Sequence, residues 1–152
     1  MTSDAALTVN IGKHVIHREE TLLHVRWIGS PTLDEQRQIY DHIAKYLEER
    51  GIALLLFDLR QAGPLPLENR EASANWWRNK PLDSIALAQY GLHKSTRFTI
   101  SMIARAIRVL AKNEIVLEDF EDEANARLWL EAVAKELRPF RSNAAAAAAP
   151  KA

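Results

Sequence analysis

The chain has one long uninterrupted apolar run that is bounded by turn signals, Ile52 to Phe57, which lies between Gly51 and the polar residues Asp58 and Arg60. Six apolar residues without alternation are typical of a strand that is buried on both faces, in a sheet covered by helices. The run is too short to cross a membrane. The pattern therefore predicts a central strand around which the rest of the fold is organised.

Apolar and polar residues alternate in the region before this run, from about Leu7 to Trp27. The alternation predicts two strands joined by a polar turn at residues 18–21. In the second strand, one face carries Leu23, Val25 and Trp27. The other face carries Leu22, His24, Arg26 and Ile28. We expect one of these faces to be wetter than the other.

The first predicted helix follows residues 29–31, a Gly-Ser-Pro sequence that ends the second strand. Thr32 and Glu35 form a capping-box pattern, in which each side chain can bond a free amide at the helix start. Helical apolar spacing continues to Leu47, and Gly51 suits the C-terminal cap. Strand, helix and buried strand then make a crossover unit, which pairs its two strands in parallel.

The remaining elements alternate between helix and strand. Helices are predicted at about 67–79, 96–111 and 122–137, and strands at about 84–90 and 115–120. This order predicts a single α/β domain, with a mixed five-stranded sheet covered by four helices. We expect residues 1–7 to be a leader, 8–140 the domain, and 141–152 a disordered tail containing six consecutive alanines.

Composition narrows the classes of function. Twenty basic residues balance twenty acidic ones, so no general attraction to nucleic acid or to an anionic membrane is expected. The absence of cysteine excludes disulfides, thiolate catalysis and cysteine-bound metal. Residues 1–6 lack the basic and apolar segments of a secretory signal, so we expect a cytoplasmic protein that does not insert into membranes.

The first candidate ligand site is the segment 91–97, between a predicted parallel strand and a predicted helix. Free amides and the helix dipole favour an anion at such a place. Four side chains would add donors: Lys94, Ser95, Thr96 and Arg97. Asp58 lies at the carboxyl end of the central strand, where open α/β sheets place their ligands. The alternatives are that the segment is a loop with ordinary polar capping and that Asp58 is a structural carboxylate. The segment is not a Walker A loop, because it lacks two of the required glycines.

The second candidate is a partner surface on the helix predicted at 67–79, formed by Trp76 and Trp77 together with Leu65 and Arg70. Tryptophan is enriched in binding hot spots. Adjacent helix positions point about 100° apart, so the two indoles cannot share one buried place and one ring could face a partner. Packing of both rings against the sheet or the loop is the alternative.

Two further patterns favour no site. A basic stripe on the helix predicted at 96–111 is more typical of a solvated face, given the net charge of zero. Its members are Arg97, Arg105, Arg108 and Lys112. His14 and His17 are an odd number of residues apart, so a strand would point them to opposite faces. No metal site and no cofactor site can be assembled from these residues.

Three local motifs, taken in order, resemble the SpoIIAA-like branch of the STAS superfamily, the anti-sigma-factor-antagonist-like domains. They are Gly29 through Glu35, the strand end Leu55 through Arg60, and Phe120-x-Asp122-x-x-x-Ala126-x-x-Trp129-Leu130. The resemblance covers about Thr8 to Leu137. It implies a fold shared with the lipid-carrying CRAL-TRIO group, and a small cytoplasmic module that binds a protein, and also an anionic ligand, without doing chemistry.

The chain departs from this family at one place. STAS domains that act as phosphorylation switches usually carry a serine directly after the strand that corresponds here to Leu54 through Asp58. This chain has Gln61-Ala62-Gly63-Pro64-Leu65-Pro66 there, and Ser73 is the nearest serine. The resemblance therefore does not extend to a kinase-controlled switch at that position.

We interpret the chain as a non-enzymatic regulatory or scaffold module that binds a protein partner in cytoplasmic signalling. Binding of a nucleotide or a phospholipid head group at residues 91–97 is the alternative. An enzyme is the third and least favoured interpretation, because no nucleophile with an adjacent base can be named. Homo-oligomerisation stays open, and no cofactor is expected.

Overall fold

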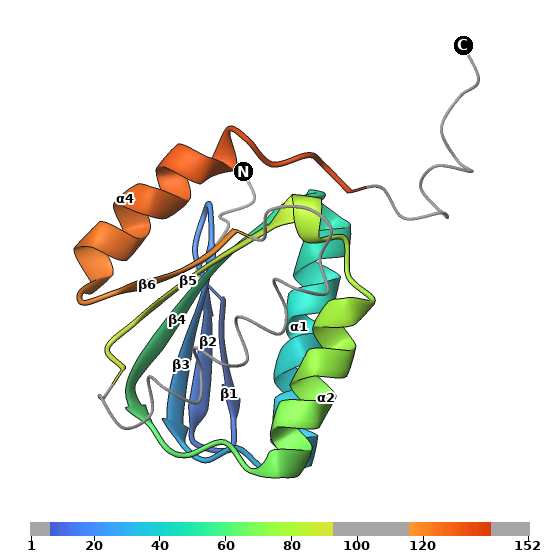
Figure 1. Ribbon diagram of the computed structural model, residues 1–152, viewed down its shortest axis with the longest axis vertical. Coiled ribbons are helices and arrows are strands. Elements are labelled where there is room, and N and C mark those ends of the chain that lie inside the picture. Colours follow the sequence, from blue (N-terminus) through green and yellow to red (C-terminus); the bar gives the residue numbers. More distant parts are fainter. Residues whose placement is uncertain (1–6, 93–115, 141–152) are drawn as a thin grey trace.

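The protein is a six-stranded sheet with helices on both faces (Figure 1). The computed structural model describes residues 7–92 and 116–140. The strands are β1 (Leu7–Ile11), β2 (His14–Arg18), β3 (Leu23–Gly29), β4 (Ala53–Ala62), β5 (Ile85–Tyr90) and β6 (Val116–Phe120). The helices are α1 (Leu33–Arg50), α2 (Leu67–Arg78) and α4 (Glu123–Ala134), with a short 3₁₀ turn, η1 (Leu82–Ser84).

The strands lie side by side in sequence order. β1 pairs with β2, and β2 with β3, in antiparallel orientation, whereas β3, β4, β5 and β6 are parallel to one another. The predicted crossover unit is therefore confirmed, with β3 and β4 parallel and α1 between them in the chain. β4 lies inside the sheet and is buried from Ala53 to Leu59, as the uninterrupted apolar run predicts.

The sheet has six strands where the sequence predicted five, because the first predicted strand is a hairpin. β1 and β2 are joined by the two-residue turn Gly12-Lys13, with Ile11 paired to His14. Gly12 has φ +59°, and no residue other than glycine has positive φ in the described structure. A glycine with positive φ in the first turn position is the arrangement of a type II′ hairpin turn. Alternation on both sides of a single glycine hid this turn from the sequence pattern.

Each face of the sheet has its own hydrophobic core. The core under α1 and α2 contains Leu23, Val25 and Trp27, which the sequence alternation placed together on one face of this strand. The face under α4 contains Leu54, Leu56, Ala126 and Leu130 among its buried residues. α4 covers β4, β5 and β6 on the other side of the sheet. The face of β3 that carries His24 and Arg26 is therefore the more exposed of its two faces.

The helix limits follow from local capping. At the start of α1, Glu35 N–H donates to the Thr32 hydroxyl and Thr32 N–H donates to the Glu35 carboxylate, which confirms the capping box. The amide of Gly51 donates to Leu47 O at the other end. At α4, the Asp122 carboxylate accepts from Asn125 N–H.

α4 is shorter than the predicted helix 122–137, and the helix predicted at 96–111 lies outside the described residues. No helix in the described ranges is long and apolar enough to span a membrane.

Candidate functional site

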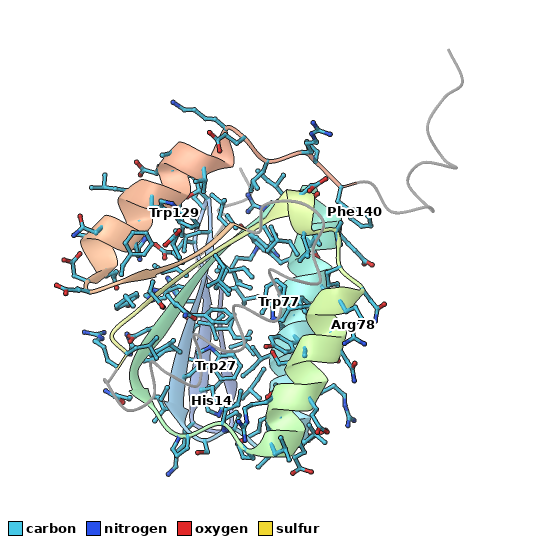
Figure 2. All side chains as sticks on the ribbon, in the orientation of Figure 1. His14, Trp27, Trp77, Arg78, Trp129 and Phe140 are labelled. Carbon is cyan, nitrogen blue, oxygen red and sulfur yellow. The ribbon has the colours of Figure 1, made fainter. Side chains whose placement is uncertain are left out.

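The two tryptophans of α2 have different environments. Trp77 is only 5% exposed and belongs to the core between α2 and the sheet, where Figure 2 shows its ring. Trp76 is partly buried, stacks on Tyr40 with ring centroids 4.6 Å apart, and has Lys80 Nζ 4.8 Å from its ring centroid. The packing alternative therefore applies to Trp77, whose ring is not on the surface.

Buried polar contacts hold α2 against α1. The Gln36 amide donates to Asn69 O, and the Asn69 amide donates to Gln36 Oε1 and Pro31 O. One turn further along α2, the hydroxyl of Ser73 is 2.6 Å from the Tyr40 hydroxyl. Each of these four side chains thus has a hydrogen-bond partner, which makes the contact between the helices specific as well as apolar. Ser73 is part of the helix interface and is buried.

The first turn of α2 carries exposed apolar surface. Leu67 is 62% exposed, and Leu65 in the preceding loop is half-buried. Arg70 is also half-buried, and its Nε is buried with no hydrogen-bond partner among residues 7–92 and 116–140. A buried N–H without an acceptor is unusual and costs free energy. We call Leu65, Leu67 and Arg70 the α2 N-terminal patch.

The second group of functional candidates lies at the carboxyl end of the parallel strands. Asp58 of β4 accepts from Arg60 Nε at 3.0 Å, from an Arg60 Nη atom at 2.7 Å and from Arg60 N at 3.1 Å. Arg26 of β3, which is paired with Asp58 across the sheet, donates from Nε at 3.3 Å. The Asp58 side chain is 2% exposed, whereas that of Arg26 is 47% exposed. We call Arg26, Asp58 and Arg60 the strand-end cluster.

The strand-end cluster keeps its carboxylate ionised. Burial alone would raise the pKa of Asp58, but the hydrogen bonds and charge of Arg60, helped by the charge of Arg26, lower this pKa to about 2. The same contacts raise the pKa of Arg60 above its ordinary value. Asp58 is thus a fixed anion that holds two guanidinium groups in place, which is a structural role and not that of a general base.

A second polar network links α4 to the sheet beside this cluster. Tyr90 donates its hydroxyl to Glu123 at 2.7 Å, so His24 Nε2, at 3.1 Å, must be the donor to the Tyr90 oxygen. Arg127 forms a bidentate pair with Glu19 in the turn before β3, with both distances 2.9 Å. Burial lowers the pKa of His24 and raises that of Tyr90. The network therefore contains a neutral histidine and a protonated tyrosine, and it positions α4.

His14 has a structural role that the sequence analysis missed. Its ring is buried beside Trp27 under the α1 face, with ring centroids 5.4 Å apart (Figure 2). Its Nδ1 accepts a hydrogen bond from Ile28 N–H at 3.0 Å, and its Nε2 is 3.7 Å from a Glu35 carboxylate oxygen. Burial lowers the pKa of His14, although Glu35 opposes this shift. The sequence offered one signal for this role: His14 lies two residues before the apolar Ile16, so in a strand both side chains point to the same, buried face.

The candidate anion-binding residues Lys94, Ser95, Thr96 and Arg97 lie outside the described residues. Their segment leaves the sheet after Tyr90, the residue of β5 that is paired with Asp58. The chain therefore enters this segment next to the strand-end cluster. No group of His, Asp or Glu that could hold a metal occurs within residues 7–92 and 116–140.

Comparison with known proteins gives a likeness of fold. No protein-family model and no curated protein matches the chain. Among solved structures, it is similar to an uncharacterised protein of the DUF3478 family with a SpoIIAA-like fold from Shewanella loihica, with 20% identity and a TM-score of 0.54. The match covers 86% of this chain and 98% of that one. The resemblance suggested by the sequence motifs is thus confirmed for the architecture, and the chain has a SpoIIAA-like fold.

Proposed function

We propose that the protein is a non-enzymatic STAS-like regulatory or scaffold module, which binds a protein partner in the cytoplasm through the α2 N-terminal patch. The observation that carries this proposal is Leu67, a large apolar side chain left 62% exposed in the first turn of a helix. Leu65 lies beside it in the chain, and Arg70 is one turn further along the helix. Binding would bury apolar surface that now faces water.

Arg70 adds a polar anchor to this patch. Arg70 is half-buried, so its guanidinium could donate to a carboxylate or carbonyl of a partner that covers the patch. Arginine beside apolar side chains is a common composition of binding hot spots. Trp76, whose ring is only partly buried, could also contact the partner, whereas Trp77 belongs to the core between α2 and the sheet.

Affinity capture from lysate of the native host tests this proposal. The full chain is compared with Leu67→Ser and Arg70→Ala, and with Leu128→Ser as the matched control. Leu128 is 63% exposed on α4, so its substitution removes the same side chain from a helix outside the patch. We expect Leu67→Ser to weaken capture of the partner at least tenfold, which corresponds to about 1.4 kcal/mol.

Circular dichroism must show that all three variants are folded. The proposal is rejected if the folded Leu67→Ser variant captures the same proteins as the wild type. It is also rejected if Leu128→Ser loses them equally, because the effect would then not depend on the patch.

A second candidate function is binding of a small anion, such as a nucleotide or a phospholipid head group, by the strand-end cluster with residues 91–97. Arg26 favours this candidate. Within the described residues, its guanidinium makes one hydrogen bond, from Nε to Asp58. The Arg26 side chain is about half-exposed and is oriented by a buried carboxylate, so it could donate to a phosphate without being reordered.

Thermal shift with inorganic phosphate and with nucleotides tests this second candidate. A rise in melting temperature should grow with ligand concentration, and Arg26→Gln or Lys94→Ala with Arg97→Ala should abolish it. Arg37→Gln, which removes an exposed arginine of α1, is the control. The anion hypothesis fails if no tested phosphate ligand shifts the transition.

A further inference from the structure

We propose that two copies of the chain associate through their β1 edges, antiparallel and about a twofold axis at Val9. β1 and β6 are the two outer strands of the sheet, at opposite ends of the strand order (Figure 1). The outer edge of β1 pairs with no strand in the described parts of the chain. This interface lies on a different element from the α2 N-terminal patch and does not depend on the function proposed above.

The two edges differ in their protection against pairing. β6 has the sequence Val-Leu-Glu-Asp-Phe, with an exposed Glu118 and a partly exposed Asp119. Charges on an outer strand discourage the addition of another strand. β1 has the sequence Leu-Thr-Val-Asn-Ile, with no charge and no proline, and most of its side chains are exposed. β1 is therefore the edge that is open to a further strand.

The register of the hairpin fixes which main-chain groups of β1 are unpaired. In a two-residue hairpin, the residues that flank the turn form a pair that exchanges two hydrogen bonds, here Ile11 and His14. Pairs of this type alternate along the strands, so Val9 and Leu7 also bond to β2. The N–H and C=O groups of Thr8 and Asn10 therefore point outward, toward the open edge.

A twofold axis at Val9 satisfies these outward groups. An antiparallel neighbour centred there places Thr8 opposite Asn10 of the second copy, and Asn10 opposite Thr8 of that copy. Each of these two pairs can exchange both of its main-chain hydrogen bonds. Val9 then lies opposite its own counterpart, and all five residues of β1 are paired.

The side chains agree with this register. Leu7, Val9 and Ile11 share the face of the sheet that carries the α1 core, and Leu7 is 58% exposed in the single chain. In the pair, Leu7 lies opposite Ile11 of the second copy, so apolar residues meet apolar residues. Thr8 meets Asn10 on the other face. β1 contains no charged side chain, so the pair brings no like charges together.

A second copy suits this edge because the contact is isologous. Each β1 edge binds the same edge of its partner, which closes the assembly as a dimer. A β1 edge joined to a β6 edge would instead be a head-to-tail contact, which leads to a ring or a filament, and it would bring Glu118 and Asp119 into the contact. The sequence of β1 is thus self-complementary, whereas that of β6 is not.

Site-specific disulfide formation in the full chain tests both the dimer and its register. The chain has no cysteine, so Val9→Cys introduces a single thiol. Residues opposite each other in an unbonded antiparallel pair have Cα atoms about 4.5 Å apart, within the range that a disulfide spans. We expect Val9→Cys to oxidise to a covalent dimer, and Thr8→Cys, whose counterpart lies off the axis, to remain largely monomeric.

Light scattering of the wild type completes the test, with an expected mass of twice 17.2 kDa. Asn10→Pro should shift this mass toward the monomer while leaving the circular dichroism spectrum unchanged, because the lost N–H faces outward and not toward β2. A monomeric wild type at high concentration overturns the proposal. Equal oxidation of the two cysteine variants overturns the register.

Discussion

The contacts of Asp58 show how a single carboxylate can organise the end of a sheet. Its side chain is almost fully buried, yet both of its cationic partners keep much of their surface in water. The free energy of this arrangement therefore comes from charge-assisted hydrogen bonds to Asp58, and only weakly from the pairing of exposed charges.

We expect Asp58→Asn to lower the free energy of unfolding by about 2 kcal/mol, because an amide cannot replace the ionised acceptor of Arg60. Arg26→Gln should cost less than about 1 kcal/mol, since Arg26 is half-exposed and makes one long contact. Urea unfolding measures both values. Asp34→Asn, on the surface of α1, is the control, and an equal loss in Asp34→Asn and Asp58→Asn would contradict this account of Asp58.

His14 should make the stability of the fold sensitive to mild acid. Burial lowers its folded-state pKa below the unfolded value of about 6.5, so the unfolded chain binds the proton more readily. The stability from neutral His14 is complete above about pH 6.5 and is lost as the pH falls below that value. Protonation would also remove the acceptor of Ile28 N–H.

The melting temperature should therefore fall between pH 7 and pH 5, and His14→Asn should make this fall shallower. The Asn oxygen can accept from Ile28 N–H but does not titrate. Some slope should remain in the variant, because burial also lowers the pKa of His24. Differential scanning fluorimetry across this pH range provides the measurement, and an unchanged slope in His14→Asn would show that His14 is not the titrating group.

Helix α2 combines a buried side and a side available for binding, and its two tryptophans separate these roles. Trp77→Ala should lower the free energy of unfolding by about 3–5 kcal/mol, because it leaves a large cavity against Tyr40 and the sheet. Trp76→Ala should cost clearly less, since its ring is only partly buried. Guanidinium unfolding of the two variants gives the comparison. Equal losses would mean that both rings are core.

Elements with a local signature could be predicted from the sequence. The capping box of α1 and the buried run of β4 are examples, because each depends on residues that are close in the chain. The β1–β2 turn was missed, since one glycine between alternating residues gives a weak signal. The pair of Arg26 and Asp58 was missed for another reason, because it depends on the parallel register of β3 and β4.

At the scale of the whole molecule, the order of motifs predicted the fold family although each motif alone was of limited specificity. The agreement with a SpoIIAA-like structure at 20% identity shows that the fold is shared although most residues differ. Function does not follow from this likeness, because folds host many functions and sites determine them. The proposed function therefore depends on surface features of this chain, above all on Leu67.

If the α2 N-terminal patch contacts a protein partner, site-specific photocrosslinking in the native host should trap that partner. A photoreactive phenylalanine analogue is placed at position 67 in one variant and at position 128 in the other, so that equally exposed helix positions are compared. We predict a covalent adduct of defined mass from position 67 and none from position 128. The absence of an adduct at position 67, or the same adduct from both positions, would contradict the claim.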